Sequence, residues 1–500
     1  MRAELGGDYT ETLRAVYKGR VPGGADLVCY WFEKARKAIE ANGLHAAGLV
    51  ATNSIRGGKN RAVLDAIART SRIYEAWSDE GWVNEGAAVR VSLVAFGHAA
   101  ENARLDGLEV GLIGADLSSP VGLINLDMTL ARVLPDNKGL SFQGPVLVGD
   151  FEIHYSTAIE WLRLPNPNGQ SSANVIRPLS NGRDITSKSR GLWVVDFDAR
   201  AEEDSALFEK PFEHVVRYVK PMRDKSRDLS RRKKWWLHGR SGADYRAATK
   251  GITRYIGTSQ VAKHRAFVWL PGRVWPHQTV IAITRADDTT FGILHSRFHK
   301  LWSLRMGTSL EDRPRYTPTT CFETFPFPEN LTPADTAHQR TERVGGSPHP
   351  SPLPGGEGAR NGAGAGDAAI IPAGLSGDVR TAAEKIAIAA KRLNDLRENW
   401  LNPPEWTQRV PEVIPLGMDT SPYPDRILPK NGHEKELAER TLTKLYNQRP
   451  AWLDAAHKAL DAAVAAAYGW ADYSADMPDE EILKRLLALN LERAVKATVR

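Results

Sequence analysis

Residues 401–406 read LNPPEW, and their types could do chemistry on a nucleobase. In a loop of the pattern Asn-Pro-Pro-aromatic, the Asn side chain and a proline-linked carbonyl accept hydrogen bonds from an exocyclic amino group, and the aromatic ring stacks on the flipped base. Here Asn402, Pro403 and Pro404 fill the first three positions, but Glu405 fills the fourth. A carboxylate has no π face to hold a base, so these letters alone do not define a catalytic loop.

Other candidate sites are incomplete. His295 and His299 are four residues apart and could share one helix face, but no third ligand stands at a fitting distance, so we predict no metal site. The glycines of VPGGADL, residues 21–27, precede a helix without a strand before them, which makes a weak phosphate loop. The chain also lacks the PD…(D/E)xK nuclease spacing, GxSxG and HExxH. On motif logic alone it carries no complete active site.

The strongest charge feature runs from Arg217 to Arg240, where ten basic residues stand against Asp224 and Asp228. Such clustering neutralises phosphates and releases counterions, and the adjoining Trp235 and Trp236 could lie against sugars or bases. The alternative is a solvated helix with two tryptophans in the core. Charge favours nucleic-acid contact, with phosphate contacts expected at the densest part of the stretch: Arg231, Arg232, Lys233 and Lys234.

A second basic group, Lys263, His264 and Arg265, precedes an apolar strand in GTSQVAKHRAFVWL. A basic turn at a strand end could contact DNA, and a plain surface turn explains the pattern equally well. We take Lys263 and Arg265 as further candidates for DNA binding.

The bulk composition is that of a globular protein. The 66 basic and 60 acidic residues give a net charge of +6, a mild bias that is informative only where the charge is clustered. Cys29 and Cys321 form neither a CxxC nor a His/Cys cluster, which argues against zinc and a disulfide scaffold and is typical of a reducing cytoplasm, the expected location. We find no signal peptide and no apolar run of about 18 residues that could cross a membrane.

The elements that must position these residues differ along the chain. Periodicity predicts helices at residues 25–39 and 61–70 and buried strands at 46–55 and 87–97. Helices that alternate with buried strands predict an α/β layer with a mostly parallel sheet. This first region is assigned to residues 1–110.

Residues 111–330 change to short strand candidates between Pro, Asn and Gly turns, which predicts a mixed α/β domain. Residues 345–366 contain eight glycines and four prolines, too little apolar surface to offset the entropy of ordering, so 331–375 is expected to be a flexible linker or insertion. Four strongly helical segments follow, and 376–500 is predicted to be an all-α C-terminal domain.

Several segments, taken together, resemble the large adenine-specific DNA methyltransferases related to the MmeI restriction-modification enzymes (type IIG). The resemblance runs from near residue 1 to 330 and resumes after the glycine-proline stretch. Among the segments that carry it are GGADLVCYWFEKA, AGLVATNSIRGGKNRAVLD, AWSDEGWVNEGAAVRVSLVAFG, RYIGTSQVAKHRAFVWL, FGILHSRFHKLWSLRMGT, RYTPTTCFETFPFP, LRENWLNPPEW and LDAAVAAAYGW.

The resemblance implies a fold: part of a Rossmann-like methyltransferase sheet in residues 1–110, a target recognition domain in 111–330 and a helical C-terminal domain. In that family a glycine-rich cofactor loop and an Asn-Pro-Pro-aromatic loop come before segments similar to residues 20–97, and this sequence contains neither. LNPPEW falls instead in the region that resembles the C-terminal domain, so the resemblance assigns Asn402 a structural role, with Pro403 and Pro404 ending a helix.

The resemblance also implies partners and site residues. The partner is double-stranded DNA, and the methyl donor is S-adenosylmethionine, with Asp26 at the edge of its pocket and Trp82 stacking on the flipped adenine; a tryptophan packed under a loop explains Trp82 equally well. Two further hypotheses stay open. The chain could be a non-catalytic DNA-specificity subunit, or the second half of a split methyltransferase whose first half is a separate chain.

Overall fold

The computed structural model describes residues 5–84, 87–98, 102–119, 128–310, 313–336, 340–345 and 368–499. The chain divides into two compact units. The N-terminal unit comprises Met1–Ala131 with Thr308–Pro314, and the main unit comprises Arg132–Gly307 with Arg315–Arg500. Among the described residues, no helix is both long and apolar enough to cross a membrane.

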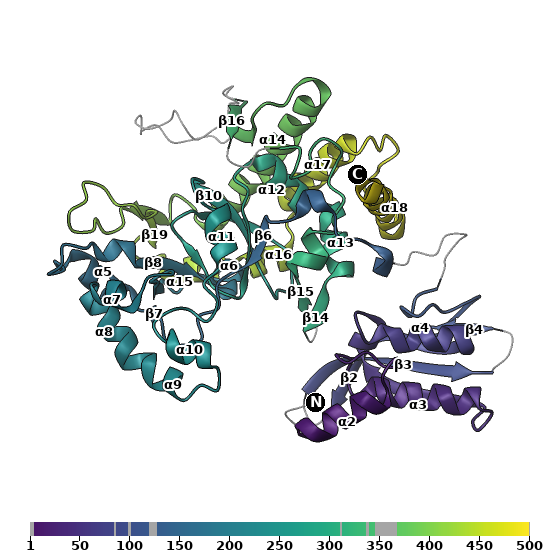
Figure 1. Cartoon of the computed structure of the whole chain (residues 1–500). Helices are drawn as coiled ribbons and strands as arrows, with labels where there is room; N and C mark the ends of the chain where they lie inside the picture. Colours follow the sequence, from purple (N-terminus) through teal and green to yellow (C-terminus); the bar gives the residue numbers. More distant parts are fainter. Residues whose placement is uncertain are drawn as a thin grey trace. The chain divides into compact units, whose positions relative to one another are not determined.

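The N-terminal unit contains a five-stranded sheet in the order β1-β3-β2-β4-β5, with helices α3 and α4 packed against it (Figure 1). Its strands are β1 (Ala46–Thr52), β2 (Arg72–Asn84), β3 (Ala87–Gly97), β4 (Ala103–Leu105) and β5 (Leu108–Val110). Its helices are α2 (Gly7–Val16), α3 (Val28–Glu40) and α4 (Arg61–Thr70). The helices predicted at 25–39 and 61–70 and the strand predicted at 87–97 are present. A strand also begins at residue 46, but it ends at Thr52 and only its Ala51 is buried, so the prediction of a buried strand at 46–55 is wrong in part.

The prediction of a mostly parallel sheet is wrong. β3 lies between β1 and β2 and is antiparallel to both, and β4 and β5 are antiparallel to each other. Among the described strands of this sheet, only β2 and β4 pair in parallel. The reason is the short connection between Asn84 and Ala87, because two residues can close a hairpin whereas a parallel crossover needs a dozen or more.

The core of the N-terminal unit lies between these helices and the sheet. Helix α3 turns Cys29, Phe32 and Ile39 inward at helical spacing, and all three are buried. The ring of Phe32 stacks on that of Phe96 in β3, with centroids 6.0 Å apart. This packing fixes the position of α3 on the sheet, and with it the position of Asp26, which lies just before the helix.

The main unit contains two four-stranded sheets, in the orders β11-β10-β13-β6 and β12-β8-β9-β7. The first consists of β6 (Ser141–Gln143), β10 (Arg254–Ser259), β11 (Phe267–Pro271) and β13 (Val280–Ile283), all antiparallel. The second consists of β7 (Glu152–Ile153), β8 (Ile176–Ser180), β9 (Trp193–Val195) and β12 (Trp275–Pro276), with β12 parallel to β8. This mixture agrees with the mixed α/β prediction.

Helices surround these sheets. They are α5 (Tyr155–Arg163), α6 (Gly182–Thr186), α7 (Glu202–Ala206), α8 (Glu209–Tyr218), α9 (Lys220–Asp224), α10 (Leu229–Lys233), α11 (Ala243–Ala248), α12 (Asp288–His295) and α13 (Arg297–Met306). Two short strands, β14 (Thr308–Leu310) and β15 (Arg313–Arg315), follow α13 in the chain, and their residues up to Pro314 belong to the N-terminal unit.

The C-terminal region is helical, as predicted, with α14 (Gly377–Leu401), α15 (Glu434–Glu439), α16 (Leu442–Gln448), α17 (Ala451–Ala467) and α18 (Asp479–Val499). It also contains one antiparallel strand pair, β18 (Thr407–Val410) and β19 (Arg426–Pro429), which the all-α prediction missed. A further pair, β16 (Thr341–Val344) and β17 (Ala369–Pro372), brackets the glycine-proline stretch. Most of that predicted flexible stretch lies outside the described residues.

The C-terminal helices pack directly on the rest of the main unit. Helices α14 and α17 lie beside α12 (Figure 1). A Cβ at Gly292 would lie 2.7 Å from Ile386 Cγ2 and 2.9 Å from Ala390 Cβ, so glycine allows α12 and α14 to approach closely. Arg397 of α14 is fully buried and donates from Nη2 to the carbonyl of Phe267 at 2.7 Å. The helical tail is therefore part of the same core as the strands.

Candidate nucleic-acid interface

Asp26 lies just before α3 and is held at the sheet edge by two side chains. Asn60 Nδ2 donates to Asp26 Oδ2 at 2.6 Å, Ser54 Oγ donates to the same oxygen at 3.0 Å, and the Asp26 amide donates to Asn60 Oδ1 at 2.8 Å. The side chain is exposed. A ligand as large as S-adenosylmethionine needs a pocket that covers most of its surface. The role of Asp26 in cofactor binding stays a prediction.

Trp82 lies near the end of β2, opposite Val89 of β3. Its side chain is 44% exposed, so it does not pack under a loop in the core. An exposed indole offers a face on which a base could stack. Stacking on a flipped adenine stays a prediction.

The cluster Arg231–Lys234 comprises the last three residues of α10 and the C-cap residue that follows them. Asp228 caps this helix by accepting from the amides of Ser230 at 3.0 Å and Arg231 at 3.2 Å, and it also forms an ion pair with Arg231. Within the described part of the chain, Arg232, Lys233 and Lys234 form no ion pair, and all three are exposed. Their charges are therefore available to an anion.

The two tryptophans after this cluster lie in the core, so their suggested contact with sugars or bases is wrong. Trp235 and Trp236 are 5% and 8% exposed, and Trp236 Nε1 donates to the carbonyl of Arg200 at 3.0 Å. Arg223, one of the ten basic residues, is also buried and donates to the carbonyls of Leu147 and Leu237. The apolar rings anchor the segment because burial of large aromatics dominates packing. The buried tryptophans therefore hold α10 in place, while its exposed cations face the solvent.

The residues of the second basic group have different environments in the structure. Lys263 is exposed. Arg265 is 7% exposed and donates from Nη1 to the carbonyl of Ser259 at 2.6 Å and to Thr258 Oγ1 at 3.1 Å, so the prediction that it contacts DNA is wrong. Its guanidinium satisfies backbone and hydroxyl acceptors in the interior instead. His264 bonds to Asn447 of α16 at 2.8 Å, which fixes the turn against the helical tail.

His295 and His299 do not share a helix. His295 ends α12, Ser296 caps α13, and His299 lies in α13. His295 Nε2 accepts from Arg397 at 2.6 Å and from the amide of Phe267 at 3.1 Å. His299 Nε2 lies 3.1 Å from the hydroxyl of Tyr316. Both imidazoles are thus occupied in the core.

Asn402 is the C-terminal cap of α14, which confirms that the helix ends before Pro403. Its Nδ2 donates to Glu398 at 3.2 Å, and Lys188 donates to its Oδ1 at 3.4 Å and to the carbonyl of Leu401 at 3.0 Å. These contacts give the side chain a structural role, in agreement with the interpretation from sequence.

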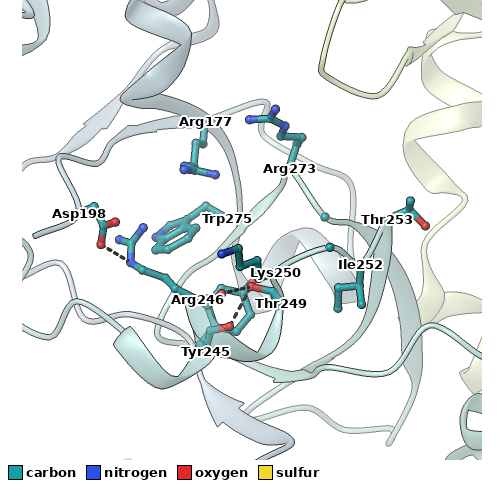
Figure 2. A pocket seen from close by; sticks show the side chains of 12 residues that line it. Arg177, Asp198, Tyr245, Arg246, Thr249, Lys250, Ile252, Thr253, Arg273 and Trp275 are labelled. Atoms are coloured by element: carbon teal, nitrogen blue, oxygen red, sulfur yellow. Dashed lines mark hydrogen bonds and ion pairs between the residues drawn. The ribbon is translucent and has the colours of Figure 1, made fainter. Parts of the chain in front are cut away.

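Sequence reasoning missed a cationic pocket in the main unit. This pocket, of about 590 Å³, lies between β8, α11 and the turn before β12, and Figure 2 shows its side chains. Its charged lining residues are Arg177, Asp198, Arg246, Lys250 and Arg273, grouped around Trp275. They come from four separate stretches, so clustering of basic residues along the sequence could not reveal them.

A buried carboxylate organises the inner side of this pocket. Asp196, 2% exposed, accepts from Arg246 Nη1 at 2.9 Å and Nη2 at 2.6 Å. Burial alone would raise the pKa of Asp196, but the neighbouring cationic groups outweigh it and hold this pKa below its ordinary value. Arg246 is thus paired with a carboxylate whose ionised form is favoured.

Comparison with known protein families gives a match that lies almost entirely within the main unit. Residues 162–329 match the family model described as the MmeI target recognition domain. This range contains both the α10 cluster and the cationic pocket, and it excludes Asp26 and Trp82. Comparison with curated protein sequences gives no match.

The fold is also similar to that of a solved enzyme. The structure of the Type IIL restriction-modification enzyme MmeI in complex with DNA superposes with a TM-score of 0.66 over 98% of this chain, at 18% sequence identity. This chain covers 55% of the length of that MmeI chain. The likeness therefore extends over both units.

Proposed function

We propose that this chain binds double-stranded DNA and selects a specific base sequence through residues 162–329. The match of these residues to the MmeI target recognition domain carries the proposal. The similar MmeI structure is a complex with DNA, which supports the same partner here.

The surface chemistry supports two kinds of contact. The exposed cations of α10 suit phosphate groups, which position a protein on the duplex without reading its sequence. Base edges must be read by other side chains in the same region, since specificity comes from hydrogen bonds and apolar contacts in the grooves. Substitutions of the phosphate-contacting cations should therefore change the overall affinity, whereas substitutions of base-reading side chains should change the sequence preference.

Selection from a pool of random duplexes tests this function directly. The full chain is incubated with the pool at about 0.1 M salt, bound duplexes are recovered and sequenced, and the enriched motif is resynthesised for anisotropy titration. We expect one enriched motif, with each mismatched base pair weakening binding by about 1–3 kcal/mol. Binding without any enriched motif would leave a non-specific DNA-binding protein and contradict the proposal.

We further propose that this recognition serves adenine N6 methylation, with S-adenosylmethionine as donor, in a cytoplasmic restriction-modification or phage-defence system. The fold similarity to MmeI over both units supports it, and Asp26 and Trp82 are the residues of this chain that would contribute. The alternatives are a non-catalytic specificity subunit and the second half of a split methyltransferase.

Labelled S-adenosylmethionine separates these alternatives. The chain is incubated with the enriched duplex alone and together with the product of the neighbouring upstream gene. We expect no transfer by the chain alone, because it carries no Asn-Pro-Pro-aromatic loop. Transfer only in the mixture identifies a split enzyme, and no transfer in either sample favours a specificity subunit. Transfer by the chain alone would contradict the expectation and point to a catalytic role for Asn402.

A further inference from the structure

The cationic pocket has a fixed inner side. Arg246 is tied to Asp196 and also lies 2.9 Å from Asp198, and its guanidinium carbon is 4.2 Å from the centre of the Trp275 ring. Arg177 also lies over this ring, at 5.4 Å, and 3.5 Å from Asp196. Figure 2 shows both guanidiniums beside the indole of Trp275. These cations are held in place before any ligand arrives.

The rim of the pocket carries two further cations, which are exposed and, among the described residues, lack the ion pairs of the inner ones. Lys250 and Arg273 are exposed, and neither forms an ion pair with any residue that the structure describes. The four cations Arg177, Arg246, Lys250 and Arg273 face two carboxylates, Asp196 and Asp198, which leaves an excess of two positive charges. A concave site with low-dielectric walls and excess charge of one sign concentrates ions of the opposite sign.

The walls that carry these rim residues are joined to each other. The amide of Gly272 donates to the carbonyl of Thr253 at 2.7 Å, and a Cβ at Gly272 would lie 2.6 Å from the carbonyl oxygen of Ile252. Glycine is needed here for the close approach of the two turns. Lys250 and Arg273 therefore project from two turns locked together, and the pocket exists without a ligand.

We propose that this pocket binds a phosphate group, with Arg273 and Lys250 contacting its oxygens and Arg177 completing the positive field. Arginine suits phosphate because its planar fork donates two parallel hydrogen bonds, and lysine adds a point charge. The phosphate could belong to the DNA backbone or to a free nucleotide, and a pocket of about 590 Å³ is within the range that holds a small ligand. Only the DNA source rests on the proposed function.

The test uses the full chain and the double variant K250Q/R273Q. Its matched control is K385Q/K496Q, which removes the same charge from exposed positions of α14 and α18. Deoxyadenosine monophosphate and inorganic phosphate are titrated by ³¹P NMR and calorimetry, and the enriched duplex is titrated over a salt series. Melting temperatures check that each variant is folded, and R273K checks whether a restored positive charge recovers part of the binding.

We expect K250Q/R273Q to weaken phosphate or nucleotide binding at least tenfold and the control to leave it unchanged. If DNA is the source, the variant should also lower the slope of log K against log salt by about 0.9 for each DNA phosphate that is no longer neutralised, and the mononucleotide should compete with the duplex. If a free nucleotide is the source, the variant should abolish mononucleotide binding and leave the DNA slope the same. Either result supports the pocket.

The outcome that overturns the proposal is equal binding of phosphate, nucleotide and DNA by the parent chain and K250Q/R273Q, with equal salt slopes. Failure of the proposed function looks different. In that case the parent chain binds no duplex selectively, while its nucleotide binding still depends on Lys250 and Arg273.

Discussion

Helix α10 concentrates Arg231, Arg232, Lys233 and Lys234 on one exposed end, and replacing all four with Gln should weaken binding to every duplex alike. The reason is that fewer DNA phosphates are neutralised, and each of them contributes about 0.9 to the slope of log K against log salt. Anisotropy titrations between about 0.05 and 0.2 M salt measure this slope. The matched control replaces Lys385, Lys435, Lys458 and Lys496, also exposed, in the helical tail. Equal slopes for both quadruple variants would show that the cluster is only a solvated surface.

Lys263 and Arg265 are two residues apart and should respond in opposite ways. Replacing Arg265 with Ala should lower the free energy of unfolding by about 2–4 kcal/mol, because buried acceptors are left without their charged donor. Replacing Lys263 with Gln should leave stability nearly unchanged and lower the DNA salt slope. Urea unfolding and the same titrations measure both effects. A stable R265A protein with weakened DNA binding would contradict the buried role of Arg265.

Sequence patterns revealed the clustered basic residues, but they could not show which basic side chains are buried. The charge run around residues 231–234 was visible because its members are adjacent. Burial of Arg223 and Arg265 was not, since a guanidinium enters the core only where tertiary acceptors such as the carbonyls of Leu147 and Ser259 meet it. Lys250 and Arg273 line one pocket because β10 pairs with β11, with Arg254 opposite Pro271, and because Gly272 bonds to Thr253; neither contact leaves a pattern of basic residues in the sequence.

The junction between α12, α13 and the helical tail contains three buried histidines, His295, His299 and His457, and it should make the fold sensitive to acid. Burial lowers the pKa of His299 and His457 to about 3 and that of His295 well below its usual range. A lowered folded pKa means that the neutral rings stabilise the fold fully above about pH 6.5 and lose this contribution as the pH falls. At pH 5 the loss is about 2 kcal/mol for each of His299 and His457.

Asp461 has the opposite effect on stability, because burial raises its pKa to about 6. Its protonation between pH 7 and 5 should raise the free energy of unfolding by about 1 kcal/mol. A net loss of stability should remain. Urea unfolding at pH 7, 6 and 5 measures it. H457Q should be less stable than the parent at pH 7 but lose about 2 kcal/mol less on acidification. Identical pH profiles for the two proteins would contradict a neutral buried His457.

The strands β16 and β17 pair antiparallel, with Val344 opposite Ala369, so the two ends of the glycine-proline stretch lie side by side. Replacing residues 346–367 with a short Gly-Ser turn should therefore change the melting temperature by only about 2 °C, since loop length costs little closure entropy. Calorimetry of both proteins makes the comparison. A drop of more than about 10 °C would mean that the stretch contributes to the core.

Elements with a strong period were predictable, whereas those with interruptions were not. Helix α4 and strand β3 match their predicted ranges, 61–70 and 87–97. The apolar residues of α4 recur with the helical period of about 3.6 residues, and those of β3 form a short continuous run. Strand β2 was not predicted. Its register shifts twice, between Ile73 and Glu75 and between Trp77 and Glu80, and these irregularities break the alternation that marks a strand. Without β2, the hairpin that makes the sheet antiparallel could not be inferred.

At the scale of the whole molecule, the recognition region and the helical tail should fold as one unit. Arg397 bonds to Phe267 and His295 inside the core, and Gly292 packs on Ile386 and Ala390. A fragment of residues 132–345 should therefore lack a cooperative melting transition, whereas 132–500 should retain one near that of the full chain. Calorimetry and near-UV circular dichroism test both fragments. Cooperative melting of 132–345 would show that residues 162–329 are an autonomous domain.

Strand β1 has a consequence for how the molecule behaves at high concentration. It is the last strand of its sheet, pairs on one side with β3, and has no other strand partner among the described residues. Its sequence AAGLVAT contains no lysine, proline or other residue that discourages strand addition. Sheet extension from this edge, by a second copy or by a strand of another polypeptide, would set an upper limit to the concentration at which the chain stays monomeric.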